Sequence, residues 1–161
     1  MNNLLKFMAI TAPGIMVACA QTQTPAQIAA DVANLAGGVA AAAQTLRNGG
    51  MLPAEQQTQV DNAVSALQAA ATAVAQASTA AAQKGATQQA VDAFNAVVGA
   101  LAGAKGIPQN VSTVLTAAEV LLPTIEALAG LPITTSASAS VTMTPDEANK
   151  ILSSAAARLH T

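Results

Sequence analysis

Apolar residues at alternating spacings of four and three are the feature that most restricts how this chain can fold. Between residues 24 and 50 they form one series: Ile28, Val32, Leu35, Val39, Ala42 and Leu46. This spacing puts them on one stripe of an α-helix, and such a stripe is buried against another helix. Thr24, Pro25 and Gln27 form the capping sequence that begins a helix. Arg47 and the glycines after it are typical of its end.

The same spacing predicts three more helices and an all-α fold, a four-helix bundle with heptad-like stripes over residues 24–130. The second is expected over residues 53–84, with Lys84-Gly85 at its end, and the third from Thr87 to Lys105-Gly106. The fourth, residues 108–130, has the broadest stripe: Val111, Val114, Leu115, Ala118, Leu121, Leu122, Ile125 and Leu128. Roughly a quarter of the residues are alanine, which favours helix. The second half of the second helix is nearly all Ala, Ser, Thr and Gln, so it has little apolar area to bury.

Two glycines, Gly37 and Gly38, lie inside the first helix and weaken it by about 1 kcal/mol each relative to alanine. They are expected at a bend or a close helix crossing rather than at a ligand site. Pro123 lies inside the fourth helix, where it is expected to produce a kink.

The C-terminal part differs from the bundle in pattern. Residues 131–143 alternate apolar residues with Ser and Thr, which indicates an extended linker, or else a strand that pairs with another chain. Residues 144–161 form a short helix with a strong start at Thr144-Pro145-Asp146-Glu147. Because a bundle can close its own core, this helix is expected to face a partner. Lys150 and Arg158 border that candidate partner face, which consists of Ile151, Leu152, Ala155 and Leu159. The alternative is that the helix folds back and covers the thin end of the second helix.

The N-terminus has the order of a secretory signal: Lys6, an apolar run over residues 7–17, and small residues around the single cysteine, Cys19. Met16-Val17-Ala18-Cys19 resembles the cleavage and lipidation site of bacterial lipoprotein precursors. The resemblance implies a signal peptide over residues 1–18, cleavage between Ala18 and Cys19, a lipid on Cys19 and a tether over residues 19–23. It also implies the periplasmic face of the outer membrane, since no aspartate follows the cysteine as in the enteric retention signal.

Two other fates of this segment remain open. Ala18-Cys19-Ala20 also fits an ordinary signal peptidase site, which would release a soluble periplasmic protein beginning at Gln21. Retention as a membrane anchor is disfavoured, because residues 7–20 are too few to cross roughly 30 Å of hydrocarbon. A protein partner or self-association is compatible with either kind of export.

The rest of the sequence argues against an enzyme. His160 is the only histidine and lies beside the C-terminus, and Cys19 belongs to the signal, so no catalytic triad, metal site or cofactor site is expected. Glu119 and Glu126 are the best carboxylate pair, but a solvated helix face is the expected role. Scattered cations and 1% aromatic residues exclude a nucleic-acid surface.

The sequence therefore favours a non-enzymatic envelope lipoprotein that presents a helical surface for protein–protein interaction or self-assembly. It also resembles small alanine-rich lipoproteins of bacteria and prophages. Two alternatives stay open: a phage-encoded envelope protein for lysis or exclusion, and a soluble periplasmic carrier of an apolar ligand.

Overall fold

The computed structural model describes residues 24–102, 104, 106–133 and 142–160, and these are folded into five α-helices with no strand among them. The helices are α1 (Pro25–Asn48), α2 (Ala54–Gln76), α3 (Ala80–Leu101), α4 (Gln109–Leu128) and α5 (Pro145–Ala157), the last followed by a short 3-10 turn, Arg158–His160. The all-α prediction is confirmed. The signal peptide, the tether, Ala18 and Cys19 lie outside the described residues, as does most of the predicted linker.

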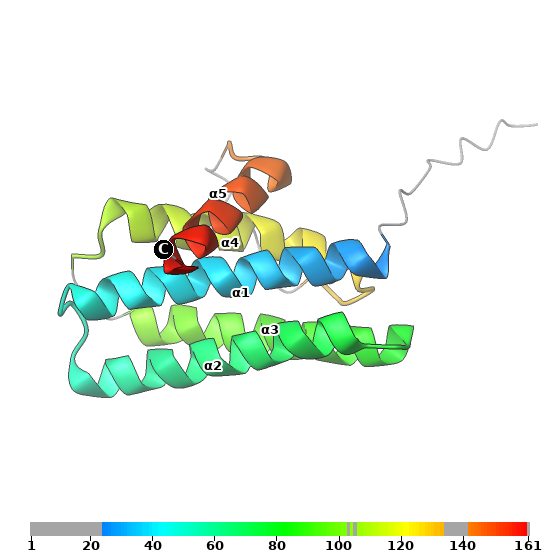
Figure 1. The fold of residues 1–161 in the computed structure, drawn as a ribbon, viewed down its shortest axis with the longest axis horizontal. Coiled ribbons are helices and arrows are strands. Elements are labelled where there is room, and N and C mark those ends of the chain that lie inside the picture. The colour runs from blue at the N-terminus through cyan, green and yellow to red at the C-terminus, as the bar shows by residue number, and fades with distance from the viewer. Residues whose placement is uncertain (1–23, 103, 105, 134–141, 161) are drawn as a thin grey trace, which may run out of the picture.

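Helices α1 to α4 run back and forth along the long axis of the molecule, and α5 crosses α1 and α4 obliquely (Figure 1). The chief packing partners are α2 with α3, α1 with α2, and α4 with α1, while α5 lies against both α1 and α4. All five helices contribute to one buried core. The structure therefore does not confirm a four-helix bundle with a separate fifth helix.

Helix α1 is the central element, and its sequence explains its limits. Thr24 and Gln27 form the predicted capping box, and the Thr24 amide donates to the Gln27 side chain at 2.7 Å. The six predicted stripe residues are all buried: Ile28, Val32, Leu35, Val39, Ala42 and Leu46. After Asn48 the chain reverses through Gly50, whose positive φ of 63° is a conformation that glycine adopts without strain. The prediction for this helix is confirmed in both position and face.

The boundary between α2 and α3 differs from the prediction. Helix α2 ends at Gln76 rather than at Lys84, and α3 begins after Thr79, whose hydroxyl accepts a hydrogen bond from the Ala82 amide at 3.1 Å. Lys84-Gly85 therefore lies inside α3. Thr87, predicted as a cap, is buried in the same helix and donates to the Gln83 carbonyl at 2.8 Å. The two helices consequently form a long hairpin with similar arms.

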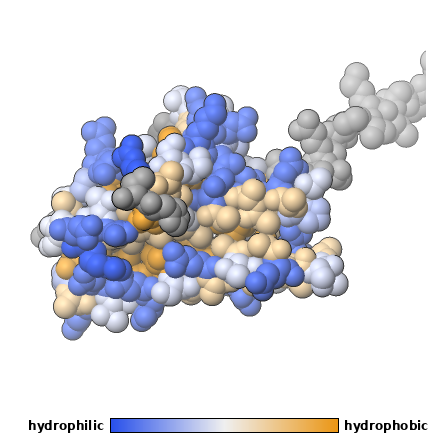
Figure 2. All heavy atoms as spheres, viewed as in Figure 1, coloured by the Kyte–Doolittle hydropathy of each residue, from blue (hydrophilic) through white to orange (hydrophobic). Residues whose placement is uncertain are grey.

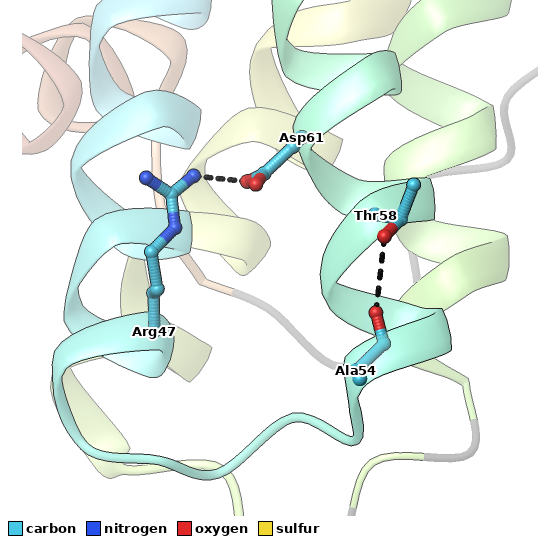
Figure 3. A network of polar contacts seen from close by, with 4 residues as sticks. All are labelled: Arg47, Ala54, Thr58 and Asp61. Atoms are coloured by element: carbon cyan, nitrogen blue, oxygen red, sulfur yellow. Dashed lines mark hydrogen bonds and ion pairs between the residues drawn. The ribbon is translucent and has the colours of Figure 1, made fainter.

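Polar side chains fix the ends of the helices to one another. Arg47 of α1 reaches across to Asp61 of α2 as an ion pair, near the first turn of α2 where Thr58 donates to the Ala54 carbonyl (Figure 3). At the opposite end, the Gln83 side chain donates to the Pro25 carbonyl at 2.8 Å, and Lys84 donates to the Gly130 carbonyl at 2.6 Å. These bonds hold the α2–α3 hairpin against α1 and α4.

Among the described helices, α1 and α4 have the length and hydropathy that a membrane span requires. About half of each apolar window, 50% and 44%, is buried inside the protein. Core helices of water-soluble proteins have the same character, so the observation does not establish a span.

Candidate functional site

Helix α5 docks closely on α1 because glycines lie at the point where the two helices cross. A Cβ atom added at Gly38 would lie 2.6 Å from Leu152 Cδ2 and 3.1 Å from Leu152 Cα. One added at Gly37 would lie 2.7 Å from Ala156 Cβ. Only glycine leaves room for α5 at this distance. The expectation of a close helix crossing at Gly37-Gly38 is confirmed.

A polar chain fastens the first half of α5 to α1. Asn149 donates to Asp31 at 2.7 Å, and its own side-chain oxygen accepts a hydrogen bond from Asn34 at 2.7 Å. Asp31 is only 9% exposed, and this burial raises its pKa above the ordinary value. The hydrogen bond from Asn149 acts in the opposite direction, and the nearby charge of Asp146 raises the pKa further. These hydrogen bonds therefore hold α5 in a defined position on α1, while the burial of Asp31 disfavours its negative charge.

The second half of α5 lies over a groove of about 640 Å³ between the C-terminal half of α1 and the N-terminal half of α4. All three helices line it: Ala41, Ala42, Gln44, Thr45 and Asn48 from α1, Asn110, Val111, Thr113 and Val114 from α4, and Lys150, Ile151, Ser154 and Ala155 from α5, with Arg158 and Leu159 following. On the face shown in Figure 2, hydrophobic residues gather along the middle and hydrophilic ones along the edges.

Three of the four predicted partner-face residues line this groove, namely Ile151, Ala155 and Leu159, and all three are partly exposed. For the fourth residue, Leu152, the prediction was wrong. Leu152 is fully buried against Gly38 and cannot contact a partner. Helix α5 is therefore a core element as well as a groove wall. The alternative expectation was also wrong in its location, because α5 covers α1 and α4 rather than the thin end of α2.

The walls supplied by α1 and α4 were not predicted as functional. Gln44 and Thr45 are four and three residues before the end of α1, and Asn110 and Thr113 belong to the first turns of α4. The glycine pair was the available signal, because a close crossing at Gly37-Gly38 brings the next helix over the residues that follow. The sequence did not show which helix that would be.

The two residues of the predicted carboxylate pair differ in burial. Glu126 is 1% exposed, so the expectation that it belongs to a solvated face was wrong, whereas Glu119 is partly exposed. Within the described ranges, no three His, Cys, Asp or Glu side chains come close enough together to hold a metal ion.

Comparison with protein-family models, with curated proteins and with solved structures found no match to this chain.

Proposed function

We propose that this protein is a lipid-anchored, non-enzymatic protein of the bacterial envelope that acts by binding. Its location on the periplasmic face of the outer membrane is inferred from Met16-Val17-Ala18-Cys19 and the residues that follow. The helix cap at Thr24 comes soon after Cys19, which is compatible with a short tether between a lipid and the folded part.

The groove between α1, α4 and α5 is the observation that supports a binding role. It combines apolar side chains with amides, hydroxyls and two cations, the mixture found in ligand and partner sites. For the scaffold we propose a four-helix bundle, α1 to α4, because these helices alternate in direction and are joined by short connections. In this view α5 is the added element that makes the groove.

Replacing Cys19 by Ser tests the anchor. We expect the wild-type chain to be labelled by fatty acid and to fractionate with membranes, and the variant to lose both properties. Ala18→Gly is the matched control, since a small residue before the cysteine is retained. An intact mass corresponding to an unmodified chain that begins at Gln21 would exclude the anchor.

A photo-crosslinking amino acid at Ser154, inside the groove, tests for a protein partner. The same amino acid at Ala73, exposed on α2, is the control. A discrete protein adduct from position 154 alone supports interaction through the groove. Equal adducts from both positions, or none from either, would contradict it.

A second candidate function is the carriage of a small apolar ligand. The size of the groove favours it, because about 640 Å³ lies inside the range of roughly 300–1,000 Å³ typical of small-molecule sites.

A further inference from the structure

We infer that the groove between α1, α4 and α5 binds a free amphipathic carboxylate, a molecule with one apolar chain and one anionic head. The inference deepens the carrier function proposed above by naming the ligand class. It does not depend on lipidation of Cys19, so the two can fail separately.

The apolar part of the groove fits a flexible chain. Ile151 and Leu159 of the C-terminal segment and Ala41 of α1 line it and are partly exposed, while Val111 and Val114 of α4 and Ala42 of α1 also line it but are buried in the core. Ile151 and Leu159 therefore supply the large apolar side chains that a ligand can still cover. Removing an alkyl chain from water against such a surface contributes about 0.8 kcal/mol for each buried CH₂.

The charges decide the sign of the head group. Among the described residues of the lining, the ionisable ones are the cations Lys150 and Arg158, without an Asp or Glu, and Arg158 also has an interaction of its own within the protein. The chain as a whole has eight acidic and six basic residues, so the lining is opposite in sign to the net charge of −2. Lys150 and Arg158 are eight positions apart, about 12 Å along a helix. The two cations therefore border a length of groove rather than a single point.

Two neighbouring features affect the electrostatic potential in the groove. The Glu147 carboxylate lies close enough to Lys150 for that cation to help lower its pKa, but it accepts hydrogen bonds from the Thr144 amide and hydroxyl at 2.8 and 2.9 Å. That carboxylate is thus directed to the helix cap and is not part of the groove lining. The first turn of α4 adds positive potential, because Asn110 and Val111 lie at the N-terminal end of the helix dipole. An anionic head is favoured over a neutral or cationic one.

A methyl NMR titration of the full-length Cys19→Ser chain tests the inference, because isoleucines occur inside and outside the groove. The probe is dodecanoate, kept below its micelle concentration, and dodecyltrimethylammonium is the control of equal chain length and opposite charge. We expect the Ile151 methyl signals to shift saturably with dodecanoate. Signals of Ile28 and Ile125, buried elsewhere in α1 and α4, should not move.

Variants identify the groups responsible. Lys150→Gln should weaken dodecanoate binding by about tenfold, the effect of one charge-assisted hydrogen bond. Arg158→Gln should weaken it by less, because the Arg158 side chain already has an interaction within the protein. Lys84→Gln removes the same charge from α3, outside the groove, and should leave the affinity unchanged. Ser154→Phe should abolish binding by filling the groove from an exposed position of α5. Thermal melts of all four variants establish that each is folded.

Three results would overturn the inference: no saturable shift of Ile151 with dodecanoate, equal binding of dodecyltrimethylammonium, or unchanged affinity in both cation variants while Ser154→Phe still binds. In the first case a protein segment would be the remaining occupant, which the crosslinker at Ser154 detects.

Discussion

Two close helix contacts in this molecule are made by different means. Helices α2 and α3 pack against each other and bury many alanines, among them Ala63, Ala70 and Ala71 of α2 and Ala86 and Ala90 of α3. Between α1 and α5 the approach depends on Gly37 and Gly38, against which Ala156 and Leu152 are placed. Both contacts bring backbones near one another, but the first distributes the contact over several turns and the second concentrates it at one point.

The difference has consequences for tolerance to mutation. Each alanine methyl in the α2–α3 contact buries little area and contributes correspondingly little free energy. A single change there should therefore have a small effect. At the α1–α5 contact a few residues, Gly37 and Gly38 with the side chains they meet, set the position of α5 and with it the groove. Three predictions test how strongly the α1–α5 contact depends on single residues, in decreasing order of expected effect.

Leu152→Ala should lower the free energy of unfolding by about 2–5 kcal/mol, because it leaves a cavity where a fully buried side chain lay. Chemical denaturation followed by circular dichroism measures the change. Leu159→Ala is the matched control on the partly exposed groove side and should cost less than about 1 kcal/mol. Equal effects of the two variants would mean that α5 is not docked through Leu152.

Gly38→Ala and Gly85→Ala should change stability in opposite directions. At Gly38 the new methyl group meets Leu152, including its Cα at 3.1 Å, so we expect a loss of about 1–2 kcal/mol after the gain in helix propensity. At Gly85, inside α3, a Cβ meets nothing within 4 Å, so the same change should stabilise by about 1 kcal/mol. Melting temperatures of the two variants provide the comparison. Stabilisation by both would contradict the close crossing.

Asp31→Asn should produce the smallest change and one that depends on pH. The fold raises the Asp31 pKa above 3.8, so the native state binds this proton more readily than the unfolded chain, and stability falls as pH rises through the raised pKa. The variant keeps an oxygen for Asn149 but carries no charge. It should therefore exceed the wild type at pH 7, by less than about 1 kcal/mol, and the difference should shrink as the pH falls toward 3. A difference independent of pH would contradict this assignment.

Much of the fold could be predicted because α1, α4 and α5 carry their own start signals. Thr24-Pro25, Pro108 and Thr144-Pro145 each mark a helix start, and the structure begins a helix there in all three cases. The apolar stripe of α4 was also found correctly. Local capping chemistry and a wide apolar stripe act over one or two turns, so they can be recognised without tertiary information.

The α2–α3 boundary could not be found in this way, because residues 76–87 contain several competing weak signals. Thr79, Gly85 and Thr87 each suit a helix end by type. Packing decides among them. With the turn at Thr79, Gln83 reaches the Pro25 carbonyl and Lys84 the Gly130 carbonyl, while Thr87 is buried. These contacts involve residues distant in sequence and are invisible to a local pattern.

The candidate site was predicted in part. The apolar face of α5 was identified from the sequence. Which of its residues are buried in the core and which line the groove depends on the place of Gly38, 114 positions before Leu152. A helical projection shows Ile151 and Leu152 as neighbours on one face. It does not show that a glycine on another helix encloses only one of them.

The position of the groove along α1 determines how far from a membrane a lipid on Cys19 would hold it. The helix begins at Pro25, and its groove residues begin at Ala41, sixteen residues and therefore about 24 Å further along the axis. With a lipid on Cys19, as we propose, an upright α1 would lift the groove clear of the bilayer surface and out into the periplasmic space. A ligand would then enter from water and not by lateral diffusion from the membrane, and lengthening the tether would change how far the protein reaches without altering what it binds.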